Sequence, residues 1–366
     1  MPHLQLLVKP VSADCNMGCS YCFYRRVSAL YPAPAAHRMS AQALEQMVSW
    51  ALRAASPDST TFCWQGGEPT LAGVHFYREA FQLMRLFGRA GQPVSNLLQT
   101  NGLLLDREWA ELCRQYRVLV GVSLDGPPDL HDHFRHYQGG GSHARVLEGL
   151  RRLQERGVEH NILTLVTSES VGRAGEIYRY LREQGFRFLQ FIPCVELGAD
   201  GRPAPWTVPA EAYGDFLCEV FDAWRQEELG AVSVRLFDAL LQWHVTGNSG
   251  LCTLDGGCGN YTVVEHTGDL YPCDFFVDKQ WHLGHVAEPT RNEAVAARFA
   301  GLRAANTAAC GDCEWLALCR GGCPKDRITA GGFDRRDYLC EGHRRFFAHA
   351  MPTLAEMAAQ IRRECP

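Results

Sequence analysis

The stretch LQLLVKPVSADCNMGCSYCFY, residues 4–24, places three cysteines in a loop directly after a short apolar run that ends at a proline. Cys15, Cys19 and Cys22 have the spacing C-x3-C-x2-C, and two aromatic residues follow. A structural zinc or an electron-transfer cluster normally takes four protein ligands. Three thiolates on a 4Fe–4S cluster would instead leave one iron able to bind a substrate or cofactor.

The rest of the N-terminal two thirds repeats the pattern of an apolar run followed by a helical stretch. Further apolar runs close on Gly, Pro, Asn or Ser and occupy residues 59–67, 95–102, 118–127, 160–168 and 186–193. Helical patterns lie between them at 40–55, with Ser40 as N-cap, and at 78–91, 107–116, 144–157 and 175–185. Six such units predict a parallel sheet covered by helices, closed as a barrel or open as a partial barrel.

Polar motifs follow the first four predicted strands. The cysteine loop comes after the first strand, and QGGEP (65–69), QTNG (99–102) and SLDGP (123–127) come after the next three. Function in parallel α/β folds lies at the carboxyl ends of the strands. These loops are therefore expected to form one site.

Composition limits the class of protein. The 366 residues exceed one ordinary domain, and the net charge of -5 argues against general nucleic-acid binding. No run of eighteen apolar residues predicts a membrane helix, and the N-terminus has no signal-peptide pattern, so a cytoplasmic protein is expected. In a reducing compartment, sixteen cysteines indicate metal binding rather than disulfides.

The cysteines that remain fall into two groups. Eight crowd into the last third, at Cys252, Cys258, Cys273, Cys310, Cys313, Cys319, Cys323 and Cys340, and they supply two sets of four ligands. The plainer alternative to two clusters is two zinc sites in a ribbon-like domain. The others are expected to be buried small residues or incidental surface thiols, namely Cys63, Cys113, Cys194, Cys218 and Cys365.

The three-cysteine loop resembles the signature of the radical S-adenosylmethionine (SAM) enzymes. The resemblance implies that the open iron binds the amino and carboxylate groups of SAM. The reduced cluster then gives one electron to the sulfonium, and a 5′-deoxyadenosyl radical forms. The alternative is a zinc site completed by a distant cysteine or histidine.

The same resemblance implies further contacts to SAM. Gly66, Gly67 and Glu68 match the family's Gly-Gly-Glu-Pro segment, which contacts the SAM amino group, although a tight turn would also use this sequence. Ser123 matches a SAM-contacting polar residue at the end of the fourth strand, or else caps a turn. Val195 would supply a backbone contact to adenine.

The cysteine-rich third resembles a SPASM domain with two auxiliary 4Fe–4S clusters. Family topology, not spacing, assigns Cys252, Cys258, Cys273 and Cys323 to the first cluster, and Cys310, Cys313, Cys319 and Cys340 to the second. With four protein ligands each, both clusters would serve electron transfer or structural support. The expected α/β fold is a partial (β/α)6 radical SAM barrel (1–246), a SPASM domain (247–345) and a C-terminal helix (346–366).

Over its whole length the chain resembles the anaerobic sulfatase-maturating enzymes. The stretches LLVKP, CSYCFY, QGGEPTLAG, LQTNG and YPCDF carry the match. The resemblance implies oxidation of a Cys or Ser side chain to Cα-formylglycine in a sulfatase segment Cys/Ser-x-Pro-x-Arg. It also implies a flavodoxin- or ferredoxin-like electron donor.

The resemblance assigns roles to three residues near the substrate. Asp274, in YPCDF, is the base that takes the thiol or hydroxyl proton after the radical has removed a hydrogen atom from Cβ. Tyr24 and Gln65 orient the reacting side chain. A turn carboxylate and a packing tyrosine are the plainer readings of Asp274 and Tyr24.

Two other functions remain open. One is a different SPASM-type radical enzyme that makes thioether crosslinks or epimers in a ribosomal peptide. The other is a non-catalytic zinc or electron-transfer protein. The histidine-rich stretch 131–136 is expected to be a solvated loop.

Overall fold

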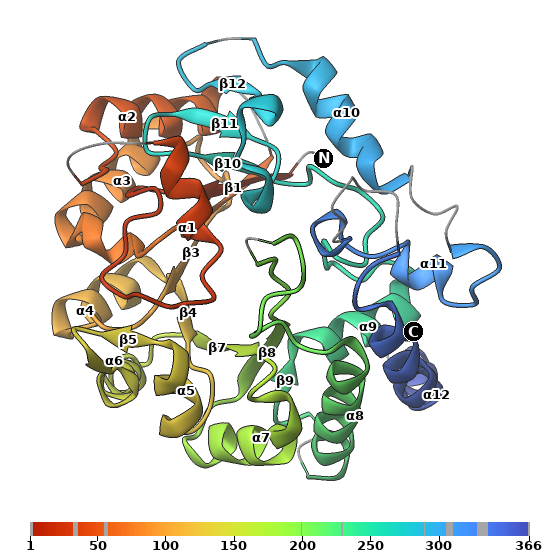
Figure 1. Ribbon diagram of the computed structural model, residues 1–366. Helices are drawn as coiled ribbons and strands as arrows, with labels where there is room; N and C mark the ends of the chain where they lie inside the picture. Colours follow the sequence, from red (N-terminus) through yellow and green to blue (C-terminus); the bar gives the residue numbers. More distant parts are fainter. Residues whose placement is uncertain are drawn as a thin grey trace. The chain divides into compact units, whose positions relative to one another are not determined.

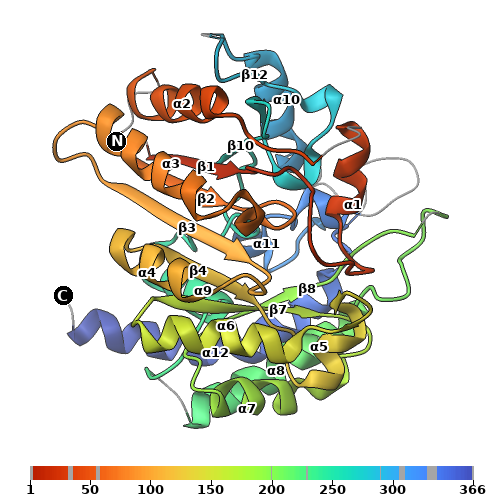
Figure 2. The ribbon, with the colours of Figure 1, turned by 90° about the vertical axis from the view of Figure 1, so that its left-hand side faces the viewer.

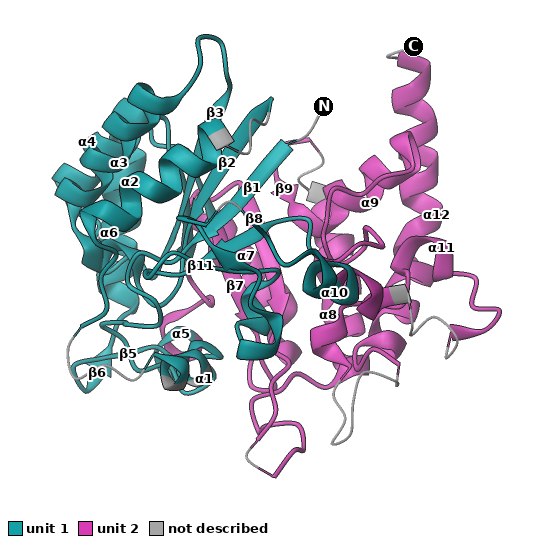
Figure 3. Ribbon diagram, turned by 90° about the horizontal axis from the view of Figure 1, so that it is seen from above, with its two compact units in different colours: residues 1–123, 131–161, 259–299 teal, residues 124–130, 162–258, 300–366 magenta. Residues whose placement is uncertain are grey.

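A computed structural model describes residues 3–31, 36–54, 58–198, 200–227, 230–288, 290–304, 310–327 and 336–364. The chain forms two compact units, shown in different colours in Figure 3. The first comprises residues 1–123, 131–161 and 259–299, and the second comprises 124–130, 162–258 and 300–366. Each unit is therefore built from segments that are far apart in the sequence.

Four predicted strands form a parallel array in the first unit. β1 (His3–Val8), β2 (Ser59–Trp64), β3 (Val94–Thr100) and β4 (Leu119–Ser123) pair in this order. Side chains of β1 and β2 such as Leu6, Phe62 and Trp64 are fully buried. The apolar runs predicted these strands because strands buried on both faces lose the polar alternation of exposed sheets.

Helices that lie between these strands or follow the last of them cover the array on its outer side (Figures 1 and 2). They are α2 (Ala41–Ser49), α3 (Val74–Phe87), α4 (Arg107–Tyr116) and α6 (His143–Glu155). The Ser40 side chain accepts a hydrogen bond from the N–H of Ala43, which confirms it as the N-cap of α2. Asp106 caps α4 in the same way.

A hairpin from late in the sequence extends the same sheet. β10 (Thr262–Val264) pairs in parallel with β1, and β11 (Asp269–Tyr271) pairs antiparallel with β10 and with β12 (Gly284–His285). Nothing in the sequence patterns predicted its place beside β1. This pairing brings the segment after β11, which contains Asp274, to the carboxyl end of β1.

The second unit has its own parallel strands and helices. Residues 162–166 of β7 (His160–Val166) pair with β8 (Phe188–Pro193), which pairs with β9 (Ser233–Val234). The helices are α7 (Ala174–Glu183), α8 (Ala210–Glu227), α9 (Arg235–Thr246), α11 (Leu316–Cys319) and α12 (Cys340–Glu364). α12 lies against α8, where a Cβ on Gly342 would come within 2.0 Å of the Ala210 carbonyl oxygen. Glycine is therefore required for this close helix contact.

One sequence expectation was wrong. Part of the histidine-rich stretch 131–136 belongs to helix α5 (Pro128–Phe134) rather than to a solvated loop. His131 is fully buried, and its Nε2 lies 3.0 Å from the Ser142 hydroxyl. Separately, within the described residues, no helix has both the length and the apolar character needed to cross a membrane.

Further elements connect these strands and helices. They are α1 (Tyr24–Val27), the small hairpin β5 (His136–Tyr137) and β6 (Gly140–Gly141), and α10 (Glu293–Ala304). α1 begins directly after the cysteine loop, so Tyr24 is held at the start of a helix beside the predicted cluster ligands.

Candidate active site

The cysteine loop lies between β1 and α1, at the carboxyl end of β1. The N–H of Cys22 donates to the Cys19 carbonyl at 3.2 Å. From the end of β3, the Asn101 side-chain amide donates to Asn16 Oδ1 at 2.8 Å and contacts Cys15 Sγ at 3.7 Å. The QTNG motif therefore helps to hold the loop that carries the predicted ligands.

The two glycines after β2 allow the chain to approach the backbone of this loop. The N–H of Gly67 donates to the Ser12 carbonyl at 2.8 Å, and the N–H of Glu68 donates to the Asp14 carbonyl at 2.7 Å. A Cβ on Gly67 would lie 2.1 Å from the Asp14 oxygen, and Gly66 has a φ of 119°. Their contact with SAM stays a prediction, but their contact with the cysteine loop is visible.

The Glu68 side chain is buried beneath this turn. Its carboxylate accepts hydrogen bonds from Thr70 N at 3.0 Å, Thr100 Oγ1 at 2.8 Å and Asn101 N at 2.7 Å. Burial raises its pKa, and these donors lower it only in part. Glu68 thus ties the end of β2 to the end of β3.

We expect Gly67→Ala to displace the cysteine loop, because its new methyl group would overlap the Asp14 carbonyl. The measurement is iron and acid-labile sulfide per chain after anaerobic reconstitution, which should fall markedly. Gly172→Ala is the control, since a Cβ there meets no atom within 4 Å. Equal iron content in both variants would contradict this account of the turn.

The predicted catalytic residues converge in the first unit. Tyr24 Oη donates to Asp274 Oδ2 at 2.5 Å. The Gln65 amide donates to the same carboxylate oxygen at 3.2 Å and to Tyr24 Oη at 2.9 Å. Burial, followed by the nearby Asp274 carboxylate, raises the pKa of Tyr24 well above its ordinary value, so Tyr24 remains a hydrogen-bond donor at neutral pH.

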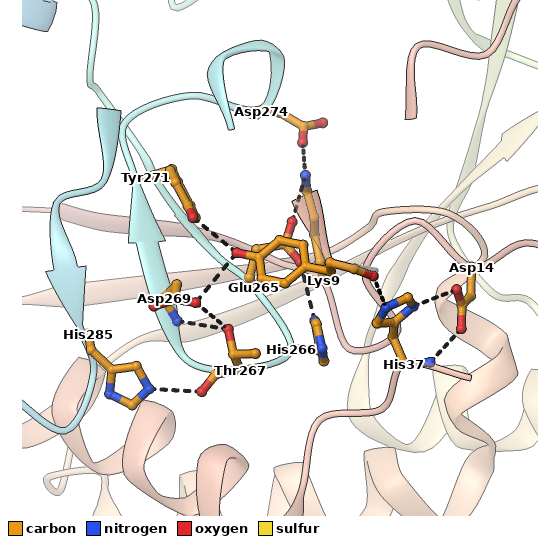
Figure 4. Close-up of polar contacts among 11 residues, drawn as sticks. Lys9, Asp14, His37, Glu265, His266, Thr267, Asp269, Tyr271, Asp274 and His285 are labelled. Atoms are coloured by element: carbon orange, nitrogen blue, oxygen red, sulfur yellow. Dashed lines mark hydrogen bonds and ion pairs between the residues drawn. The ribbon is translucent and has the colours of Figure 1, made fainter. Parts of the chain in front are cut away.

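Two charged residues that the sequence analysis did not single out complete this cluster. Lys9 Nζ lies 2.7 Å from Asp274 Oδ1 and 3.2 Å from Glu265 Oε1 (Figure 4). Burial alone would lower the pKa of Lys9, but the two carboxylates raise it above the ordinary value. A lysine at the end of an apolar strand was the one sequence signal that could have revealed the pair.

A tyrosine links Asp274 to the neighbouring predicted cluster ligand. Tyr261 Oη lies 3.3 Å from Cys273 Sγ, and it accepts a hydrogen bond from the Asp274 N–H at 3.3 Å. Burial raises the pKa of Tyr261 well above its ordinary value. This hydroxyl therefore contacts both the Cys273 thiol and the Asp274 backbone N–H.

The second unit brings together the four cysteines predicted for the second auxiliary cluster. They line a single cavity of about 270 Å³, together with side chains that include Trp315, Asp337 and His343; the cysteines are Cys310, Cys313, Cys319 and Cys340. Four thiol donors around a space of this size suit a group larger than a single metal ion. Asp337 closes one side and accepts hydrogen bonds from the N–H groups of Cys323 and Leu339.

The other predicted ligand set is divided between the units. Cys273 belongs to the first unit, and Cys252, Cys258 and Cys323 belong to the second, so this set stays a prediction. In the second unit, the buried Arg303 donates to the Cys252 carbonyl at 2.6 Å and to the Cys319 carbonyl at 3.2 Å. Arg303 thus joins the ligand loops of both predicted auxiliary clusters.

The structure also places the two remaining predicted SAM contacts. Ser123 is the half-buried last residue of β4. Val195 follows β8 and is buried, and its carbonyl oxygen lies 3.3 Å from Lys325 Nζ. Both residues stand at the carboxyl ends of their strands, and their contact with SAM stays a prediction.

A known protein family and known relatives match this sequence, the relatives over nearly its whole length. Residues 10–183 match the family model of the radical SAM superfamily. The cysteine-type anaerobic sulfatase-maturating enzyme of Clostridium perfringens is 35% identical, over 99% of this chain and 100% of the relative. The serine-type enzyme of Bacteroides thetaiotaomicron is 33% identical, over 98% of this chain and 92% of the relative.

Solved structures match the fold as well. A structure described as native anSMEcpe with bound AdoMet and Cp18Cys peptide is 34% identical, with a TM-score of 0.89 over 98% of this chain and 100% of that chain. Streptococcus suis SuiB, at 17% identity and a TM-score of 0.64, shares the fold. The prediction of a radical SAM α/β fold is confirmed, and the chain belongs to the anaerobic sulfatase-maturating enzymes of the radical SAM superfamily.

Proposed function

We propose that this enzyme oxidises a Cys or Ser side chain to Cα-formylglycine in a sulfatase segment of the type Cys/Ser-x-Pro-x-Arg. The buried arrangement of Asp274, Tyr24 and Gln65 next to the cysteine loop carries the proposal. It offers a carboxylate base held by two oriented donors, as proton removal from a substrate thiol or hydroxyl requires.

The described residues suit the cofactors of this family. Cys15, Cys19 and Cys22 would hold the SAM-binding cluster, and the cavity cysteines of the second unit would hold an auxiliary cluster. When bound, the cluster and SAM supply the 5′-deoxyadenosyl radical that removes a hydrogen atom from the substrate Cβ. The cysteine loop is held for this task by hydrogen bonds from Gly67 and Glu68.

Asp274 keeps acceptor capacity on Oδ1 for the substrate. A carboxylate offers about four lone-pair directions. Oδ2 accepts from Tyr24 and Gln65, and Oδ1 contacts Lys9. The substrate S–H or O–H donates to Oδ1, and Asp274 takes its proton there.

The electron balance needs one acceptor besides Asp274. Loss of the Cβ hydrogen atom, the thiol or hydroxyl proton and one electron leaves a C=S or C=O double bond, and water converts the thioaldehyde to the aldehyde with release of hydrogen sulfide. Cys273, a proposed auxiliary-cluster ligand, directly precedes Asp274. The proton acceptor and a ligand of the electron acceptor are therefore adjacent in the sequence. A small flavodoxin- or ferredoxin-like protein is the proposed source of the electrons for SAM cleavage.

Mass spectrometry of three matched peptides tests the proposal. The peptides are Cys-x-Pro-x-Arg, Ser-x-Pro-x-Arg and Ala-x-Pro-x-Arg, and they differ only in the residue to be oxidised. The reconstituted enzyme, SAM and a reductant should convert the Cys peptide, the Ser peptide or both to the aldehyde and leave the Ala peptide unchanged. Deoxyadenosine without any aldehyde would keep the radical SAM chemistry but refute this substrate class. A different ribosomal peptide would then be the substrate to seek.

A further inference from the structure

Strand register places Lys9 and Glu265 side by side. β1 and β10 run parallel with Val8 opposite Val264, and the N–H of Lys9 donates to the Val264 carbonyl at 2.9 Å. Lys9 and Glu265 are the next residues after these two strand ends. Two segments separated by more than 250 residues therefore deliver opposite charges to the same end of the sheet.

Both side chains are fully buried, and so is nearly all of Asp274. Burying three charges is costly before they are paired, and a packed apolar group is often as stable as a buried ion pair. Stability is therefore a weak reason for this arrangement. A requirement of the reaction is the stronger reason.

The contacts of Asp274 indicate that the reaction requires a fixed orientation of its carboxylate. The terminal torsion of an aspartate is broad and roughly two-fold, so a single contact does not fix the plane of the carboxylate. Tyr24 and Gln65 both bind Oδ2, and Lys9 is 2.7 Å from Oδ1. Among the described residues, the ion pair with Lys9 is the contact made by the second oxygen, so it determines which way Oδ1 faces.

We propose that Lys9 is a positioning residue that fixes the carboxylate plane of Asp274, and that Glu265 holds Lys9 in place for this purpose. The inference rests on the proposed role of Asp274 as the base. It adds two residues that act on the proton-transfer step and not on radical formation.

Glu265 is itself held from its far side (Figure 4). His266 Nδ1 lies 3.6 Å from Glu265 Oε2, and the rings of His37 and Tyr31 pack on the His266 ring at centroid distances of 4.9 and 5.1 Å. The order of contacts runs from His266 through Glu265 and Lys9 to Asp274. Each residue limits the freedom of the next.

The test compares the ratio of two products in the holoenzyme. A Cys peptide with deuterium at Cβ reports radical attack as deuterium transferred to deoxyadenosine, and formylglycine reports the complete reaction. The main variant is the double substitution Lys9→Met with Glu265→Gln, which removes one cation and one anion and so leaves the net charge of the cluster unchanged. We expect deuterium transfer to persist and formylglycine per deoxyadenosine to fall ~10-fold or more, since small misplacements of a reacting group can cost ~10²-fold.

Two further variants make the result specific. Lys9→Arg keeps a cation and should recover part of the lost ratio. Tyr31→Phe keeps the ring that packs on His266 and removes only the hydroxyl, which lies 3.0 Å from the Tyr271 hydroxyl, so its ratio should equal that of the wild type. A partial recovery by arginine would not follow if Lys9 had only a packing role.

The outcomes separate the inference from the proposed function. Wild-type enzyme that makes no formylglycine would refute the proposed function itself. Wild-type activity combined with an unchanged product ratio in the double variant would refute only the role of Lys9 and Glu265. Should the double variant fail to load iron, Glu265→Gln alone decides, because it leaves Lys9 its Asp274 partner and should still lower the ratio several-fold.

Discussion

Asp274→Asn should lose formylglycine formation by ~10²–10⁴-fold, the usual contribution of a positioned base, while keeping its clusters and some SAM cleavage. Asparagine has nearly the same shape but cannot accept the substrate proton. Folding should survive, because Lys9 keeps the Glu265 carboxylate as an ion-pair partner at 3.2 Å. The measurement is formylglycine, deoxyadenosine and iron per chain in one anaerobic assay.

Asp278→Asn is the matched control for this variant. Asp278 is an exposed carboxylate four residues further along, and it only caps a short 3-10 turn through the N–H of Gln280. It should retain nearly full activity. Full formylglycine formation by the Asp274 variant would remove Asp274 as the base, and loss of deoxyadenosine together with formylglycine would assign it a role in SAM binding instead.

Cys19→Ala should abolish SAM cleavage altogether. A three-thiolate site has no spare ligand, so the cluster that activates SAM should not assemble in an active form. Deoxyadenosine formation should drop below detection even without peptide substrate, and the electron paramagnetic resonance signal of the reduced SAM-binding cluster should disappear.

Cys63→Ala provides the control for cysteine loss in general. Cys63 lies within β2 and belongs to none of the predicted ligand sets. Its variant should cleave SAM at the wild-type rate. Normal cleavage by the Cys19 variant would overturn the assignment of the three-cysteine loop.

Local sequence patterns predicted the strands well and one pairing not at all. The six apolar runs became β1, β2, β3, β4, β7 and β8, because each is bounded by turn residues and followed by an amphipathic helix. The pairing of β10 with β1 could not be predicted in the same way. β10 has only three residues, and nothing in its local pattern encodes a parallel register with a strand at the other end of the chain.

Some residues of the candidate site were predicted from the sequence and others were missed. The resemblance placed Tyr24, Gln65 and Asp274 together, and the structure gives them hydrogen bonds to one another. Lys9 and Glu265 were missed because charged residues are almost never fully buried unless they are paired, and the pairing depends on the β1–β10 register. His131 was misjudged for a related reason, since its polar neighbours in sequence hide a buried contact with Ser142.

β10 pairs with β1 but is synthesised more than 250 residues later, and this order affects the nascent chain. Until residues 262–264 emerge, one side of β1 is an edge with unpaired backbone groups, which is the kind of surface that recruits other chains. At roughly 5–20 residues per second this interval lasts on the order of 10–50 s. A nascent chain halted before the hairpin would have the three-cysteine loop but neither the proposed base Asp274 nor a covered edge. The hairpin therefore covers the edge of β1 and brings Asp274 to the end of that strand at the same stage of synthesis.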